Sequence, residues 1–133
     1  MLFTISRGNI PGRKQADIVY LVSAIEWVSE RNLGYVFTDG HPIMLITSFF
    51  DNTDDLDKID WNLMGATYWH DIATDLDRKR RRQAEFLVHD FFPLDLVGGI
   101  AVYDEDMEER VTDSINTLVA KPTIAVKRGW YYA

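Results

Sequence analysis

The chain has 133 residues, a length that fits one domain at about 100–200 residues per domain, and 47% of them are hydrophobic, enough for one packed core. It has no cysteine, which excludes disulfides and thiolate metal sites. Its net charge of −7 argues against a protein that coats nucleic acid with its whole surface, although one local basic groove is compatible with that charge.

Met1–Ser6 is predicted to form a strand, and residues 7–16, which contain Gly8, Pro11 and Gly12, are predicted to form a loop. The chain does not start with a charged segment followed by a long apolar one, so the sequence predicts no signal peptide. No window approaches the ~20 apolar residues that a bilayer span needs. We therefore expect a cytoplasmic protein with no membrane segment.

A buried strand and a short helix are predicted next. Ile18–Val22 is a continuous apolar run rich in β-branched residues, which favours a strand buried on both faces. Ser23, followed three residues later by Glu26, forms a capping box, so a helix should begin there and end at Gly34. Tyr35–Thr38 is then predicted as the next strand.

The pattern weakens from His41 to Arg82. A short helix or two turns are predicted between Asp54 and Met64, and residues 71–77 are predicted to be irregular. About forty residues with little regular structure inside a compact domain usually form a functional loop. The aromatic residues of this region indicate that the loop packs rather than floating as a linker.

The last third of the chain is predicted to contain two strands, a helix and a final strand. Ala84–His89 and Gly99–Tyr103 are the two strands, and Asp104 is the expected N-cap of a helix that reaches about Val119. Thr123–Lys127 alternates as a last strand would. Because strands dominate and two modest helices interrupt them, the sequence predicts a single α+β domain.

Gln83 and Glu85 are the first candidates for chemistry. In a strand, residues i and i+2 lie on the same face, so both side chains are expected to point the same way. A carboxylate at the mouth of a strand, with an amide two residues earlier, resembles the arrangement by which ADP-ribosyltransferases handle NAD. The carboxylate can hold the ribose hydroxyls and offset the positive charge that develops on the sugar, while the amide orients the acceptor. The alternative is a strand-edge glutamate that is solvated or paired with an arginine.

A run of five cations, from Arg78 to Arg82, lies directly before this pair. Arginine and lysine bind phosphates whatever the base sequence, and rings such as those of Tyr68 and Trp69 can stack on bases. Together these residues suggest a groove for a single strand of nucleic acid. Alternatively, the run is a solvated loop whose charge is balanced by neighbouring aspartates. Those aspartates are Asp71, Asp75 and Asp77.

His41 follows a predicted strand closely, which is a usual place for a site residue, although a lone histidine there is more often structural. The other histidines and the aspartates show no metal-ligand spacing, so we expect no metal site. A magnesium-dependent nuclease with Asp77 and Glu85 as paired carboxylates is a third possibility. Such sites usually need a lysine on the catalytic strand, and none follows Glu85.

Five segments occur in a fixed order: Asp17–Ser23, Phe37–His41, Asp57–Trp61, Tyr68–Trp69 and Arg80–Val88. So ordered, they closely resemble the DarT family of DNA ADP-ribosyltransferase toxins, from the first residue to about residue 126. The resemblance implies a compact ADP-ribosyltransferase fold in a single domain, residues 1–133, with a strand-rich core and a long substrate-recognition loop. It also implies transfer of ADP-ribose from NAD, without a metal, onto a base of single-stranded DNA.

The resemblance further implies roles for single residues. Glu85 would be the catalytic glutamate, Gln83 would orient the acceptor, and the segment from about residue 41 to residue 83 would be the recognition loop. The residues expected to contact DNA are His41, Tyr68, Trp69, Arg80, Arg81 and Arg82.

An antitoxin with a macrodomain that removes the modification is the partner that the resemblance implies. The family carries an N-terminal NAD-binding portion, and Met1–Phe3 looks like its tail, so we expect that portion to be missing from this chain. The alternative function is therefore a catalytically inactive module of the same fold that binds single-stranded nucleic acid.

Overall fold

The computed structural model of the protein describes residues 2–132, and Met1 of the predicted first strand lies outside them. The described residues form two compact units. The terminal unit consists of residues 2–27 and 93–132, and the central unit consists of residues 28–92. Within residues 2–132, no helix has the length and apolar character that crossing a bilayer requires.

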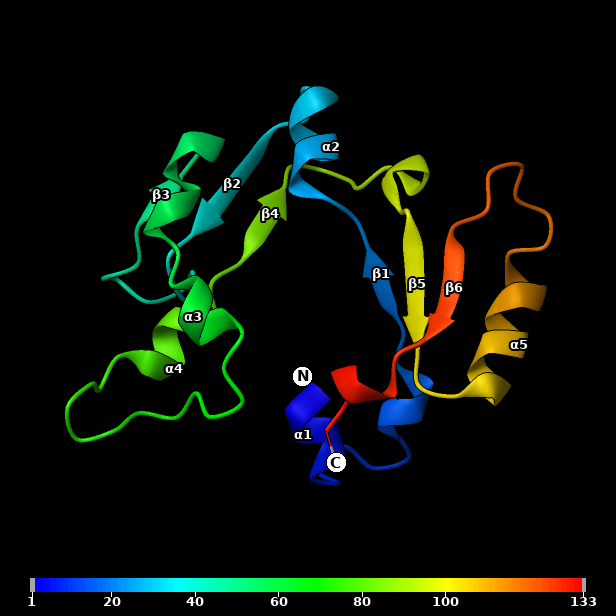
Figure 1. The fold of residues 1–133 in the computed structure, drawn as a ribbon, viewed down its shortest axis with the longest axis horizontal. Helices are drawn as coiled ribbons and strands as arrows, with labels where there is room; N and C mark the ends of the chain where they lie inside the picture. Colours follow the sequence, from blue (N-terminus) through cyan, green and yellow to red (C-terminus); the bar gives the residue numbers. More distant parts are fainter. Residues whose placement is uncertain (1, 133) are drawn as a thin grey trace. The chain divides into compact units, whose positions relative to one another are not determined.

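The terminal unit is built on a three-stranded sheet in the order β1-β5-β6 (Figure 1). Its strands are β1 (Tyr20–Val22), β5 (Gly99–Val102) and β6 (Thr123–Val126). β5 lies in the middle, antiparallel to β1 and parallel to β6. Leu21 of β1 is 62% exposed, so the prediction that this strand is buried on both faces is wrong.

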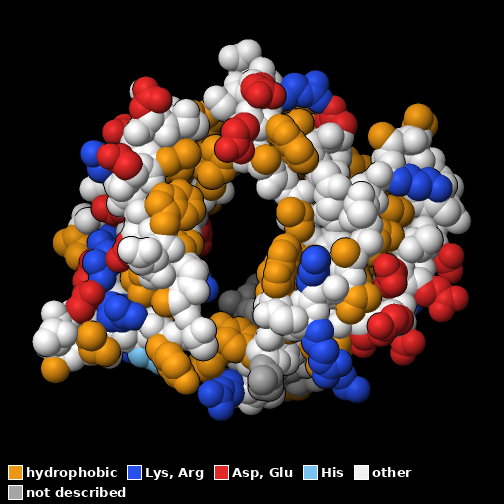
Figure 2. Space-filling model, in the orientation of Figure 1, with side chains coloured by type: hydrophobic (Ala, Val, Ile, Leu, Met, Phe, Trp, Pro, Cys, Tyr) orange, Lys and Arg blue, Asp and Glu red, His pale blue; other side chains and the backbone are white. Residues whose placement is uncertain are grey.

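The helix α5 (Glu105–Ser114) packs against this sheet. The carboxylate of Asp104 accepts a hydrogen bond from the backbone N–H of Met107 at 3.0 Å, which confirms Asp104 as the N-cap. Figure 2 shows acidic side chains gathered over this helix, on the side away from the core. The buried cluster between helix and sheet consists of Val97, Ile100, Val102 and Met107.

The segment Leu2–Ser6 forms a helix, α1, so the predicted first strand is wrong. Ile5 is buried, and the ring of Phe3 contacts that of Tyr132 edge-on at 5.3 Å. The sheet of this unit is already made of β1, β5 and β6, so packing rather than strand pairing sets the conformation of so short a segment. The remaining short helices of the unit are η1 (Gln15–Asp17), η3 (Leu94–Leu96) and η4 (Arg128–Trp130).

The central unit contains a second three-stranded sheet, in which all pairs are antiparallel (Figure 1). β2 (Tyr35–Thr38) lies between β3 (Phe49–Phe50) and β4 (Phe86–Val88). The prediction for β2 is confirmed, whereas the two-residue β3 was missed. Phe37 is only 2% exposed and its ring stacks on rings of both neighbouring strands, so this face of the sheet is the core of the unit.

The helix α2 (Ile25–Glu30) starts two residues after Ser23, so the predicted capping box does not start it. The Ser23 hydroxyl instead donates to the carbonyl of Leu96 at 2.6 Å. Asn32, rather than Gly34, adopts the left-handed conformation that follows the helix, with φ of 52°.

The long segment between β2 and β4 is more regular than expected. The predicted helix or pair of turns within residues 54–64 is confirmed as η2 (Thr53–Lys58) and α3 (Trp61–Met64). The basic run forms a one-turn helix, α4 (Arg78–Arg81), which was not predicted. With these helices and two small sheets the chain has the α+β fold that the sequence predicts.

Candidate active site

Glu85 lies directly before β4, and its side chain is exposed. Its backbone is fixed by Thr38, the last residue of β2. The N–H of Thr38 donates to the carbonyl of Glu85 at 2.9 Å, and the N–H of Glu85 donates to Thr38 Oγ1 at 3.0 Å. The central sheet therefore holds the main chain of this residue while the carboxylate faces solvent, where it can meet a ligand.

Gln83 does not lie in the strand, because α4 and the turn after it occupy the residues before Ala84. The prediction that it shares a strand face with Glu85 is therefore wrong. The exposed Gln83 side chain folds back, and its Nε2 donates to the carbonyl of Lys79 at 2.8 Å. This bond uses one of the two amide protons, so the second proton and Oε1 of the side chain remain for contact with an acceptor.

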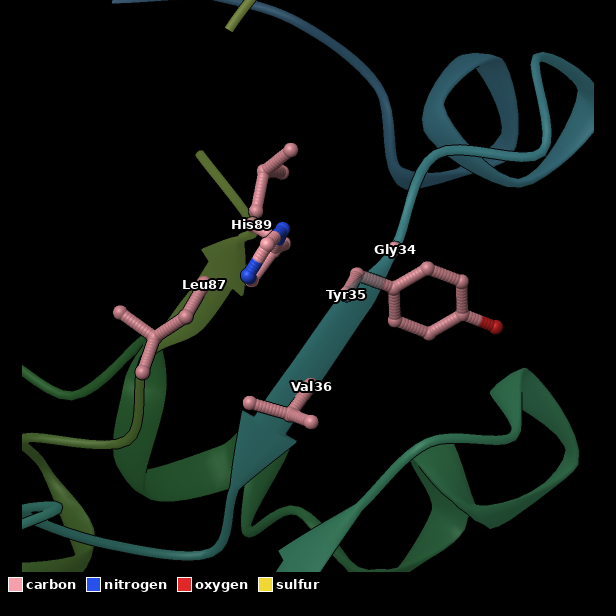
Figure 3. Close-up of a pocket in the computed structure, with 6 residues that line it drawn as sticks. Gly34, Tyr35, Val36, Leu87 and His89 are labelled. Carbon is pink, nitrogen blue, oxygen red and sulfur yellow. The ribbon is translucent and has the colours of Figure 1, made fainter. Parts of the chain in front are cut away.

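An apolar hollow opens on one face of the β2–β4 pair (Figure 3). Val36 and Leu87 lie opposite each other in the register of this pair, and Glu85 lies two residues before Leu87, just outside the strand. The lining residues are Gly34, Tyr35, Val36, Leu87, Val88 and His89.

Arg80 is the centre of an ion-pair network. Its Nε and Nη2 donate to the two carboxylate oxygens of Asp77, both at 2.7 Å, and its Nη1 donates to Asp39 at 2.9 Å. The Arg80 side chain is only 10% exposed. Hydrogen bonds to Asp77 raise the pKa of Arg80, and the same bonds lower the pKa of Asp77. Because two guanidinium nitrogens of Arg80 bond to the two oxygens of one carboxylate, the pair has a specific, bidentate geometry.

The same guanidinium closes the turn that follows β2. Its Nη1 also donates to Thr47 Oγ1 at 3.2 Å, and the backbone carbonyl of Arg80 accepts from the N–H of His41 at 2.9 Å. A Cβ added at Gly40 would lie 2.3 Å from Nη1, so only glycine lets the side chain pass. Arg80 therefore joins α4 to the turn, a long-range role that the sequence did not reveal.

Arg81 pairs with aspartates from two parts of the loop. It bonds to Asp75 and lies 3.4 Å from Asp60, with a longer approach of 3.8 Å to Asp77. The Nε of Arg82 is buried and has no hydrogen-bond partner among the described residues. The contacts of Arg81 are those of the charge-balancing alternative, and Figure 2 shows acidic and basic side chains interspersed over this part of the surface.

Arg78 and Lys79, the first two cations of the run, bond to the preceding part of the loop. Arg78 donates to the carbonyls of His70 at 3.0 Å and Tyr68 at 2.7 Å. The backbone N–H of Lys79 donates to Asp71 at 2.8 Å, and its ammonium lies 3.7 Å from the same carboxylate. Arg78 thereby anchors the aromatic part of the loop.

The aromatic candidates lie in the same loop. Tyr68 is 82% exposed, as a stacking surface must be, whereas Trp69 is half-buried and its ring lies 4.4 Å from that of His70. His41 is half-buried at the turn after β2, where its carbonyl accepts from Thr47 Oγ1 at 2.8 Å and its Nδ1 lies 3.5 Å from the N–H of Ile43.

Thr38, Asp39 and Thr47 are the residues of this region that sequence reasoning missed. No local pattern in the sequence marks Asp39 as a side chain that pairs with Arg80 from 41 positions away. Both oxygens of Asp77 are bonded to Arg80, which argues against the paired-carboxylate nuclease. Across residues 2–132, no group of three or more potential metal ligands comes together.

Comparison with known proteins gives one family. The family described as "ssDNA thymidine ADP-ribosyltransferase, DarT" matches residues 1–132. A DNA ADP-ribosyl transferase of Thermus aquaticus is 35% identical over 120 residues, which are 89% of this chain and 51% of that protein. The chain thus spans about half the length of this curated relative.

Solved structures agree with this match. Thermus sp. 2.9 DarT in complex with NAD⁺ superimposes with a TM-score of 0.92 at 31% identity, over 98% of this chain and 66% of that one. The same protein in complex with ADP-ribosylated single-stranded DNA gives a TM-score of 0.91 at 31% identity, over 98% and 63% of the two chains.

Proposed function

Since this chain belongs to the DarT family, we propose that it transfers ADP-ribose from NAD to a thymidine base of single-stranded DNA. The observation that carries the proposal is Glu85, an exposed carboxylate directly before β4 on a backbone that Thr38 holds through two hydrogen bonds. The complexes of Thermus sp. 2.9 DarT with NAD⁺ and with ADP-ribosylated DNA support the choice of donor and acceptor.

In the proposed reaction, the bond between ribose C1′ and the nicotinamide nitrogen breaks, and nicotinamide leaves with the electron pair. The Glu85 carboxylate accepts hydrogen bonds from the ribose hydroxyls and offsets the positive charge that develops on the sugar. A nitrogen of the base then bonds to C1′ and its proton is released. Gln83 orients the base through Oε1 and the amide proton that does not bond to Lys79.

The segment between β2 and β4 is proposed to hold the DNA. Tyr68 and Trp69 would stack on bases, held in place by Arg78. His41, Arg81 and Arg82 would line the path of the strand. The burial of Arg80 in its ion pairs leaves little of it for phosphate, so we assign this residue to the internal support of the loop.

The family resemblance supports two further parts of the proposal. The partner is an antitoxin whose macrodomain removes ADP-ribose from DNA, so that the two proteins form a toxin–antitoxin pair. The reaction takes place in the cytoplasm, where NAD and transiently single-stranded DNA are both present.

Intact-mass analysis of single-stranded oligonucleotides incubated with the protein and NAD tests the reaction. We expect the gain of one ADP-ribose unit on thymidine-containing strands, its loss in Glu85→Ala, and its retention in Glu109→Ala, which removes an exposed glutamate of α5. EDTA should have no effect.

Labelling by Glu85→Ala at the wild-type rate would refute the catalytic assignment. Binding of single strands without NAD binding, measured by calorimetry, would instead support the catalytically inactive binding module.

A further inference from the structure

Thr38 is completely buried, yet its hydroxyl connects two segments of the central unit. Oγ1 donates to the carbonyl of Gly40 at 2.7 Å and accepts from the N–H of Glu85 at 3.0 Å. Its 3.4 Å separation from the carbonyl of Glu85 is a longer contact, and the single hydroxyl proton serves the shorter one.

Thr38 lies where the regular backbone hydrogen bonding between β2 and β4 ends. Phe37 pairs with Phe86, so Thr38 lies opposite Glu85. A regular antiparallel pair of this kind exchanges two backbone bonds. Here the N–H of Thr38 does donate to the carbonyl of Glu85, but the return bond from Glu85 ends on the Thr38 hydroxyl. The Thr38 hydroxyl thus replaces a backbone acceptor in the last pair of the two strands, and its partner in that pair is Glu85.

We infer that Thr38 is a positioning residue for the carboxylate of Glu85, an inference that rests on the proposed function. Because the site is buried, no water can replace the hydroxyl, and its removal leaves the N–H of Glu85 and the carbonyl of Gly40 unpaired. The backbone at Glu85, directly before β4, must then shift so that these two groups form other hydrogen bonds. A displacement of about 1 Å at a reacting group can lower a rate by about a hundredfold.

Two substitutions separate the hydroxyl from the shape of the side chain. Thr38→Val keeps the shape and removes the hydroxyl, whereas Thr38→Ser keeps the hydroxyl and removes a methyl group. Thr112→Val is the matched control, because it removes an exposed hydroxyl that donates to the carbonyl of Glu108 in α5. The rate of ADP-ribose transfer, the KM for NAD and the thermal midpoint are measured for each.

We expect kcat of Thr38→Val to fall about tenfold or more, with a smaller change in KM for NAD, while Thr38→Ser stays within about threefold of the wild type and Thr112→Val is unchanged. Rescue by serine excludes a general loss of packing, because serine is the smaller residue. Wild-type kcat in Thr38→Val, or equal loss in both Thr38 variants, would overturn the inference.

Amide hydrogen exchange at Glu85 provides a readout that does not depend on the reaction. We expect slow exchange in the wild type and in Thr38→Ser, and faster exchange, localised at Glu85, in Thr38→Val. Equal exchange in all three would overturn the inference even if the protein transfers ADP-ribose. Conversely, absence of transfer by the wild type would count against the proposed function, and the exchange pattern would still decide the role of Thr38.

Discussion

Replacing Arg80 with alanine should destabilise the protein without removing a contact to DNA phosphate. The substitution removes two hydrogen bonds to Asp77 and one to Asp39, and it leaves both carboxylates without this partner. The Arg80 side chain is 10% exposed, whereas those of Asp39 and Asp77 are 25% and 40% exposed. The network is therefore neither a surface pair nor a fully buried one.

Exposed ion pairs contribute about 0.2–1 kcal/mol, and removal of one partner from a buried pair costs about 3–5 kcal/mol. With one buried member and two partly exposed partners, we expect Arg80→Ala to lower the free energy of unfolding by about 2–3 kcal/mol. Urea denaturation followed by tryptophan fluorescence measures this difference. Lys79→Ala is the control, because the Lys79 side chain is 55% exposed and its ammonium lies 3.7 Å from Asp71, so the change should cost less than about 1 kcal/mol.

Salt dependence of binding to a single-stranded oligonucleotide tests the second half of this prediction. A phosphate contact contributes about 0.7 to the slope of log K against log salt concentration for single strands. Because Arg80 is occupied by aspartates, the slope for Arg80→Ala should match that of the wild type. A salt slope that falls by about 0.7 in Arg80→Ala, together with a loss in unfolding free energy below about 0.5 kcal/mol, would refute the reasoning. That result would identify Arg80 as a residue that contacts DNA phosphate.

Two further predictions concern the same network. Gly40→Ala places a Cβ 2.3 Å from Arg80 Nη1, so it should lower the free energy of unfolding by about 1–3 kcal/mol. The loss should be much smaller when Arg80 is also replaced by alanine. Equal losses with and without Arg80 would contradict the contact. The lowered pKa of Asp77 should stabilise the fold fully above the ordinary value of 3.8, and this contribution should disappear as the pH falls through the lower folded-state value. The stability difference between wild type and Asp77→Asn, measured by urea titration from pH 6 to pH 2.5, should therefore shrink below about pH 4. A difference that stays constant over this range would rule out the linkage.

Local patterns predicted those elements whose conformation depends on neighbouring residues. Tyr35–Thr38 is apolar, bounded by a glycine and an Asp-Gly turn, and it forms the expected strand. Asp104 is a helix N-cap because its side chain reaches the N–H three residues later. In contrast, Leu2–Ser6 is helical because of packing within the terminal unit, where Ile5 is buried, and no pattern within five residues records that contact.

The candidate site shows the same division. The sequence identified Glu85 and the adjacent cations, because motif and composition are local properties. It could not decide between a DNA-binding groove and a charge-balanced loop, since that choice depends on which aspartates fold against the run. Two of the pairing residues, Asp39 and Asp60, are supplied from well outside the run.

The number of charges in a basic run is therefore a poor measure of the charge that a ligand can meet. Arg80, the middle cation of the run, has a side chain that is only 10% exposed, and its guanidinium is bonded to Asp39 and Asp77. Its removal would free two carboxylates as well as delete one positive charge, so the local potential would become more negative without the loss of any phosphate contact. Lower DNA affinity in such a variant would therefore not by itself identify a binding residue. The salt slope is the more direct test, because each phosphate contact contributes about 0.7 to it for single strands.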